Sequence, residues 1–155
     1  MKHISFRILV ILLLLVTTSF PGPSFAKDTV TSARLHGSWS GQWSSPDGVI
    51  YLAELHLESA GNGTVKGQIN WILNKSPRTE EQSKLGLTGI EFVKGTYNPA
   101  NKVLSIDGYS KTDPNSILGL DKYRLILAVN GAAIGGVTWN HGSWRGLLGL
   151  RRTEN

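Results

Sequence analysis

After residue 34 the sequence is a succession of short segments in which apolar and polar residues alternate. In the first segment, at 35–43, Leu35, Trp39 and Trp43 alternate with Ser38 and Gln42. A period of two places apolar side chains on one face of a β-strand and polar side chains on the other. The pattern recurs and predicts further strands at 49–58, 65–73, 87–97, 103–109, 123–129, 133–139 and 143–152.

Residues typical of tight turns separate these segments. They lie at 44–48, 60–63 and 98–101, and Asn130-Gly131 is the strongest hairpin signal in the chain. Short turns join strands that are neighbours both in sequence and in space. The sequence therefore predicts an antiparallel meander of eight strands.

Two segments break the alternation and carry helix signals. Ser76 suits an N-cap, Pro77 the first helical position and Gly86 the residue after a helix, which predicts a short helix near 76–85. Asp113, Pro114 and Gly119 repeat the same order of signals. We expect about one helical turn there.

Eight sequential strands leave two edges that must be protected, and closure into a barrel removes both. Glycines inside the expected strands favour closure, because a strand tolerates glycine best where it bends or approaches a neighbour closely. These glycines are Gly67, Gly89, Gly95, Gly108, Gly135, Gly136, Gly146 and Gly149. We predict an all-β fold, an eight-stranded antiparallel up-and-down β-barrel, with a two-sheet β-sandwich as the alternative.

The N-terminal segment differs from the rest of the chain. Lys2 and Arg7 provide a positive start, 8–16 is an unbroken apolar run, and Ser24-Phe25-Ala26 is a small-x-small cleavage site. This order predicts a signal peptide at 1–26, cleaved after Ala26, because the apolar run is too short to span a bilayer. We expect the mature protein to be a single domain at 27–155, in the periplasm or outside the cell.

The composition narrows the options further. The sequence has no cysteine, so packing and hydrogen bonds alone must hold the fold, although an exported protein could form disulfides. The formal net charge of +5 is mildly basic, without a run of like charges. The one close basic group, Arg145, Arg151 and Arg152, is interpreted as a solvated strand end rather than a phosphate site. We expect no nucleic-acid partner.

Gly37-Ser38-Trp39 resembles the Gly-x-Trp signature of the calycin superfamily, the lipocalins and avidins. The resemblance implies that Trp39 closes one end of the barrel and packs under an arginine of the last strand. Arg152 is the expected partner, because it shares the strand parity of Leu148 and Leu150, and Arg151 is the alternative. The resemblance also implies a cup that binds a small ligand at the open end.

Aromatic residues are the candidates to line such a cup, because their rings supply area and shape for an apolar or sugar-like ligand. The alternative is that these rings fill the core. An eight-stranded barrel is just wide enough either to be filled by side chains or to hold one small molecule. The candidate ligand-binding residues are Trp43, Trp71, Trp139, Trp144, Tyr51 and Tyr123.

Catalytic and metal-binding patterns are weak. Glu54, His56 and Glu58 share one face of the second expected strand, a spacing that could hold a metal, but a solvated outer face is favoured. His141 lies in a turn, where a titrating side chain could serve binding or acid–base chemistry, although a plain turn is favoured.

Glu91 and Asp107 are candidates for paired carboxylates in the barrel mouth, or for outward-pointing side chains. Nothing in the sequence places the two together. With no convincing constellation of this kind, we expect no catalysis, no metal and no cofactor.

The sequence thus predicts a soluble, exported β-barrel that binds a small apolar or sugar-like ligand. One alternative is a non-catalytic protein-interaction module of the cell envelope, such as an inhibitor or an assembly accessory. Another is a small outer-membrane barrel. Segments shorter than about 9–11 residues disfavour this last alternative.

Overall fold

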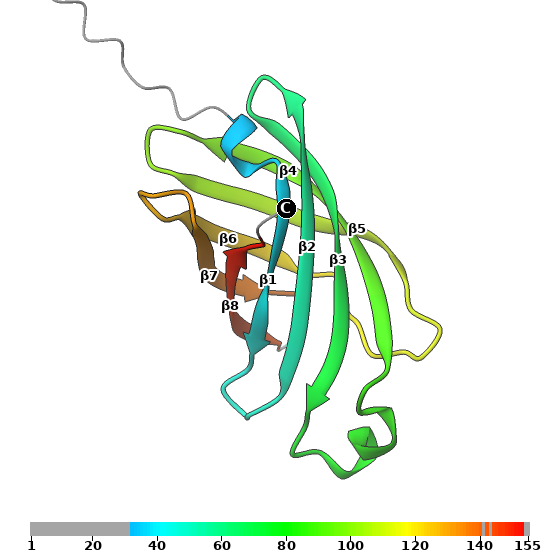
Figure 1. Cartoon of the computed structure of the whole chain (residues 1–155). Helices are drawn as coiled ribbons and strands as arrows, with labels where there is room; N and C mark the ends of the chain where they lie inside the picture. The colour runs from blue at the N-terminus through cyan, green and yellow to red at the C-terminus, as the bar shows by residue number, and fades with distance from the viewer. Residues whose placement is uncertain (1–31, 141, 143, 154–155) are drawn as a thin grey trace, which may run out of the picture.

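The computed structural model describes residues 32–140, 142 and 144–153, so the expected signal peptide lies outside the described residues. The chain forms a closed barrel in which every strand pairs with its sequence neighbours and β1 pairs with β8 (Figure 1). The predicted up-and-down β-barrel is confirmed, and the sandwich alternative is wrong. The strands are β1 (Gly37–Ser44), β2 (Ile50–Gly61), β3 (Thr64–Lys75), β4 (Thr88–Asn98), β5 (Val103–Thr112), β6 (Lys122–Leu127), β7 (Ala133–Trp139) and β8 (Arg145–Arg152).

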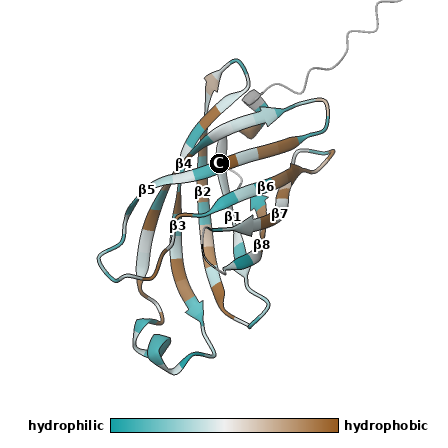
Figure 2. Cartoon of the chain, turned by 180° about the vertical axis from the view of Figure 1, so that it is seen from behind, coloured by the Kyte–Doolittle hydropathy of each residue, from teal (hydrophilic) through white to brown (hydrophobic). Residues whose placement is uncertain are grey.

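Alternation along the strands builds the core. In β2, burial alternates residue by residue from Tyr51 to Leu57, so one apolar row faces inward and one polar row faces out. Figure 2 shows this alternation of hydropathy along the strands. The inward side chains form one hydrophobic cluster, in which Trp39, Leu55 and Leu104 are among the most buried.

One end of the barrel is closed by the 3-10 helix η1 (Ser32–Leu35). Trp39 Nε1 donates a hydrogen bond to the Leu35 carbonyl at 3.2 Å, and Leu35 is fully buried. The Arg152 guanidinium lies 4.1 Å above the Trp39 ring, the contact that the calycin resemblance implies. Arg152 also donates to the carbonyl oxygens of His36, at 2.9 Å, and Arg34. This contact ties the first and last strands together at the closed end.

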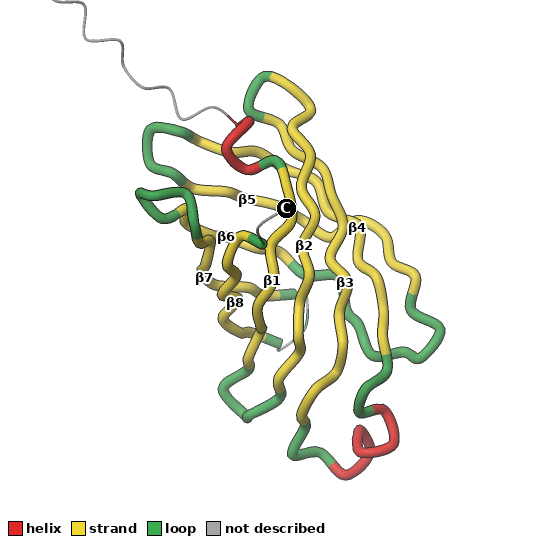
Figure 3. The backbone as a smooth tube through the Cα atoms, viewed as in Figure 1, coloured by secondary structure: helices red, strands yellow, loops and turns green. Residues whose placement is uncertain are grey.

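The expected helix at 76–85 is shorter and tighter than predicted. The structure has a 3-10 helix, η2 (Thr79–Lys84), at the end of the barrel opposite η1 (Figure 3). Ser76 does not cap it, because its hydroxyl accepts a hydrogen bond from the Arg78 amide at 3.1 Å in the preceding turn. That local bond uses the serine in a turn, and the helix begins two residues later than predicted, at Thr79.

The prediction of a helical turn after Asp113 is wrong. The Asp113 carboxylate accepts hydrogen bonds from the amides of Ile117, at 2.9 Å, and Leu118, at 2.8 Å. These side-chain bonds replace the backbone bonds of a helix, so 113–121 forms an irregular connection. It lies at the same end of the barrel as η2, together with the β1–β2 and β7–β8 connections.

The outer surface is divided. Charged side chains such as Glu54, Glu58, Lys66 and Lys94 are exposed on β2, β3 and β4, where a membrane-spanning barrel presents an apolar band. Over β6, β7 and β8 the outer face instead exposes large apolar side chains: Ile126, Val137, Trp139 and Leu147. No helix among the described residues has the length and apolar character needed to cross a membrane.

Candidate ligand-binding site

A cavity of about 270 Å³ opens at the η2 end of the barrel, and we call it the cup. Its wall comes from β1 to β4, and its rim from η2, the connection at 113–121, Asn140 and Trp144. Drug-sized ligands usually occupy pockets of about 300–1,000 Å³, so the cup fits a compact molecule. Its aromatic lining residues are Trp43, Tyr51, Trp71 and Trp144.

These four rings form a continuous chain around the cup. The ring of Trp43 lies 5.9 Å from that of Trp144 and 5.8 Å from that of Tyr51, and Tyr51 lies 5.9 Å from Trp71. The two contacts of Tyr51 are edge-to-face, the geometry that aromatic quadrupoles favour. The rings therefore stabilise one another around an open space.

Each inner ring is also fixed by a hydrogen bond. Trp43 Nε1 donates to Thr138 Oγ1 at 2.6 Å, and the Tyr51 hydroxyl donates to the Ile117 carbonyl at 2.6 Å. Burial raises the pKa of Tyr51 to about 12, so its hydroxyl stays protonated and keeps this bond at neutral pH. Gly146 leaves room for the Trp43 indole, because a Cβ there would lie 2.3 Å from the ring.

A buried carboxyl group faces the cup. Glu91 on β4 is only 2% exposed and lies inside the barrel. Its Oε2 accepts hydrogen bonds from Trp71 Nε1, at 3.2 Å, and from the Tyr123 hydroxyl. Its Oε1 accepts from the Asp121 amide at 2.8 Å. The hydrogen bonds join β3, β4, β6 and the 113–121 connection through one side chain.

Burial raises the pKa of Glu91 to about 7, and the nearby Asp121 carboxylate acts in the same direction. The three hydrogen bonds oppose this shift but do not cancel it. Burial also raises the pKa of Asp121, against a hydrogen bond from Asn140. The cup thus holds two carboxyl groups that protonate more easily than exposed ones.

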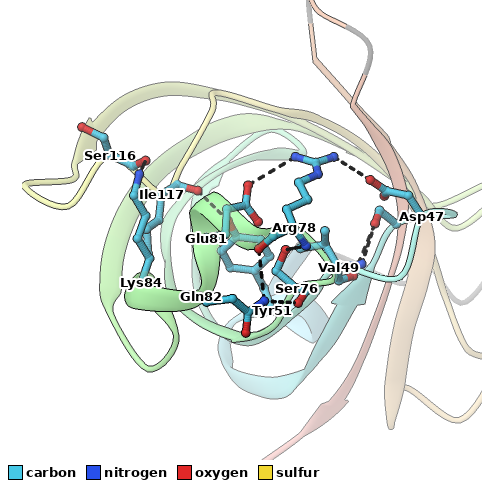
Figure 4. A network of polar contacts seen from close by, with 11 residues as sticks. Asp47, Val49, Tyr51, Ser76, Arg78, Glu81, Gln82, Lys84, Ser116 and Ile117 are labelled. Atoms are coloured by element: carbon cyan, nitrogen blue, oxygen red, sulfur yellow. Dashed lines mark hydrogen bonds and ion pairs between the residues drawn. The ribbon is translucent and has the colours of Figure 1, made fainter.

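The rim of the cup is held by ionic contacts (Figure 4). Arg78 lies 4.2 Å above the Trp144 ring and pairs with Asp47, at 2.6 Å, and Glu81, at 3.2 Å. Lys84 Nζ donates to the Ser116 carbonyl at 3.0 Å. Through these contacts η2 is linked to the β1–β2 turn on one side and to the 113–121 connection on the other.

The structure brings together most of the predicted aromatic residues. Trp43, Tyr51, Trp71 and Trp144 line the cup, whereas Tyr123 is buried and reaches it only through Glu91. Trp139, which is expected from the sequence to line the cup, lies on the outer face instead and is 38% exposed. The inward residues of β7 are Ile134, Gly136 and Thr138, so Trp139 has the opposite parity.

The polar candidates have different outcomes. Of the two alternatives for Glu91 and Asp107, neither holds for both residues: Glu91 faces the cup, whereas Asp107 is exposed. The carboxylate beside Glu91 is that of Asp121. Glu54, His56 and Glu58 are exposed on the outside, and His56 Nδ1 shares a 3.1 Å hydrogen bond with Ser38 Oγ. In the part of the chain that the structure describes, no group of three or more potential ligands could hold a metal. His141 lies outside the described residues.

Four lining residues of the cup carry no signal in the sequence pattern: Asp121, Glu81, Lys84 and Asn140. All four lie in connections or in η2, where no periodic pattern of apolar residues shows which side chains point inward. Compared with known proteins, the chain matches no family model and no curated protein.

Proposed function

We propose that the protein is a non-catalytic binding protein that holds a small ligand in the cup. The observation that carries this proposal is the chain of four aromatic rings around a cavity of about 270 Å³. Rings that merely filled a core would pack against one another without such a space. The aromatic wall suits an apolar or sugar-like body, and the cavity limits its size.

Two further features support this proposal. The Glu91 carboxyl is engaged by three donors, which favours a structural and orienting role over proton transfer. The Arg152 contact with Trp39 lies at the far end of the barrel from the cup, the arrangement that the resemblance of the Gly-x-Trp motif to calycin proteins implies. We extend the proposal to a calycin-like barrel that is exported after cleavage behind Ala26. N-terminal sequencing of the protein from its native host tests this extension, because the first residue is then Lys27.

The binding proposal is tested by screening small molecules for changes in tryptophan emission and melting temperature. A ligand of the cup should lose affinity in Trp144→Phe, because the ring at the rim is reduced, and keep its affinity in Trp139→Phe. Trp139 is the matched control, because it lies on the outer face. Silence across a broad panel, or equal loss in both variants, would remove the proposal.

A second candidate function, the protein-interaction module, is favoured by the outer face of β6, β7 and β8. Val137 pairs with Arg124 on one side and with Leu147 on the other, and Leu147 is 61% exposed. The three strands contain no acidic residue, and their exposed basic residues are Arg124, Arg145 and Arg151. This face fits a partner protein with an acidic, partly apolar surface.

This candidate is tested by cross-linking in the native host. A specific partner should be lost in a Val137→Ser, Leu147→Ser variant and retained in Leu52→Ser, which removes an exposed leucine from β2. Retention of the same partner in both variants would exclude this face as the interface.

A further inference from the structure

The cup is acidic, although the whole chain carries a net positive charge of +5. Three carboxyl groups line it, from Glu81, Glu91 and Asp121, and the lining has one ammonium group, that of Lys84. The Arg78 guanidinium at the rim is shared between Glu81 and Asp47, so it offsets only part of this negative charge. Lys84 is at the rim, where its Nζ already donates to the Ser116 carbonyl at 3.0 Å. The charge in the cup is therefore complementary to a positively charged ligand.

The hydrogen-bond donors of four aromatic residues inside the barrel, Trp43, Tyr51, Trp71 and Tyr123, are already used within the protein. Trp43 Nε1 donates to Thr138, and the Tyr51 hydroxyl donates to the Ile117 carbonyl. Trp71 Nε1 and the Tyr123 hydroxyl both donate to Glu91. A ligand rich in acceptors, such as a carboxylate, would find these donors occupied.

Acceptors, in contrast, are not all paired within the protein. Glu81 Oε2 is buried and has no hydrogen-bond partner among the described residues, while Glu81 Oε1 accepts from Arg78. Glu91 accepts three hydrogen bonds, whereas a carboxylate offers about four acceptor positions. The open acceptors call for donors on the ligand.

The aromatic wall suits the same class of ligand. The faces of indole and phenol rings attract cations, and the contact is strongest where water is excluded. The Arg78 guanidinium, 4.2 Å above Trp144, is a cation held in this way at the rim. Inside the cup, Trp43, Tyr51 and Trp71 provide further rings within a mainly buried space.

We infer that the ligand of the cup is a compact organic cation, an amine with an apolar or aromatic body, whose ammonium group is held by the carboxyl groups of the cup. This inference rests on the proposed binding function and specifies its ligand class. The sequence predicts an apolar or sugar-like ligand instead. The two acidic lining residues Glu81 and Asp121 lie in segments without a strand pattern, so the sequence does not place them in the cup.

The test uses three probes with one body and different head groups: tyramine, tyrosol and 4-hydroxyphenylacetate. They carry an ammonium, a hydroxyl and a carboxylate, respectively. Calorimetric titration at pH 8 should show tyramine binding at least about tenfold more tightly than tyrosol, with the carboxylate the weakest of the three. Glu81→Gln should reduce the preference for tyramine, and Glu54→Gln on the outer face should leave it unchanged.

The outcomes separate the two proposals. If tyrosol binds as well as tyramine, or the carboxylate binds best, the inference is wrong while the binding function stands. If none of the three binds at millimolar concentration, the inference is also wrong. The binding function is then lost only if the broad panel is silent as well. If Glu54→Gln weakens tyramine as much as Glu81→Gln does, the ammonium is not held in the cup.

Discussion

Gly108 on β5 lies directly against the carboxyl group of Glu91 on β4. A Cβ at residue 108 would lie 1.8 Å from Glu91 Oε1, closer than any non-bonded contact allows. The register between β4 and β5 also shifts between Phe92 and Val93, one residue beyond Glu91. The buried carboxyl therefore depends on a neighbour without a side chain.

Gly108→Ala should destabilise the protein by about 1–3 kcal/mol, because the new methyl group displaces Glu91 from its three donors. Urea unfolding followed by tryptophan emission measures the change. Gly149→Ala is the matched control, since a Cβ there meets no atom within 4 Å. Equal unfolding midpoints for the two variants would contradict the contact.

Glu91 should make stability depend on pH in an unusual direction for a carboxyl group. Its pKa is raised from 4.5 to about 7 in the folded protein, so the folded state binds a proton that the unfolded state has lost. Stability should therefore fall as pH rises from about 4.5 to about 7, by about 3 kcal/mol at most, and level off above. Protonation of Asp121, whose pKa is also raised by burial, acts in the same sense.

Comparison with Glu91→Gln isolates this contribution. Asp121, Glu81, Lys84 and the neutral Tyr123 hydroxyl remain in the variant, so the difference between the two proteins reports Glu91 together with its electrostatic coupling to Asp121. Relative to Glu91→Gln, the wild type should lose free energy of unfolding as the pH rises from 5 to 8. A difference independent of pH would show that Glu91 has an ordinary pKa.

Trp39→Ala should be the most damaging truncation, at about 3–5 kcal/mol, because the ring is fully buried beneath Arg152. Thermal and urea unfolding measure the loss. Trp139→Ala removes the same side chain from the outer face and should cost far less. Similar losses for the two truncations would mean that Trp39 does not close the barrel.

Arg78→Ala should loosen η2 with little effect on global stability. Ion pairs near the surface, such as the exposed pair with Asp47 and the partly buried pair with Glu81, contribute about 0–1 kcal/mol. Hydrogen exchange of residues 76–87 and acrylamide quenching of Trp144 should both increase, since the guanidinium no longer covers the ring. Lys66→Ala, which removes an exposed ion pair with Glu58 on the barrel wall, is the control. Unchanged exchange at 76–87 would show that Arg78 does not hold η2 at the rim.

The strands could be predicted because burial alternates along them in step with the sequence. This alternation correctly places the side chains of Trp43, Trp71 and Tyr51 inside the barrel. It also places Glu91 inside, because Glu91 alternates in step with the buried Val93 and Tyr97. The alternation fails for Trp139, because β7 has apolar or small residues on both faces. The sequence therefore does not show which face of this strand points inward.

The rest of the cup depends on connections rather than strands. Asp121 reaches Glu91 because Asp113 folds the 113–121 segment through its own hydrogen bonds. Arg78 covers Trp144 because η2 starts late, after the Ser76 turn. Such contacts between distant connections leave no periodic pattern, so the sequence predicted the barrel and its rings but not the charge of the cup.

The most direct test of ligand binding in the cup follows the indole N–H signals of the five tryptophans by NMR during a titration with tyramine. Binding in the cup predicts shifts for Trp43, Trp71 and Trp144, while the signals of Trp39, at the closed end, and Trp139, on the outer face, stay in place. Assignment by single Trp→Phe variants identifies each signal. Shifts confined to Trp139, or no shift at any tryptophan with tyramine and the broad panel, would contradict a ligand-binding cup.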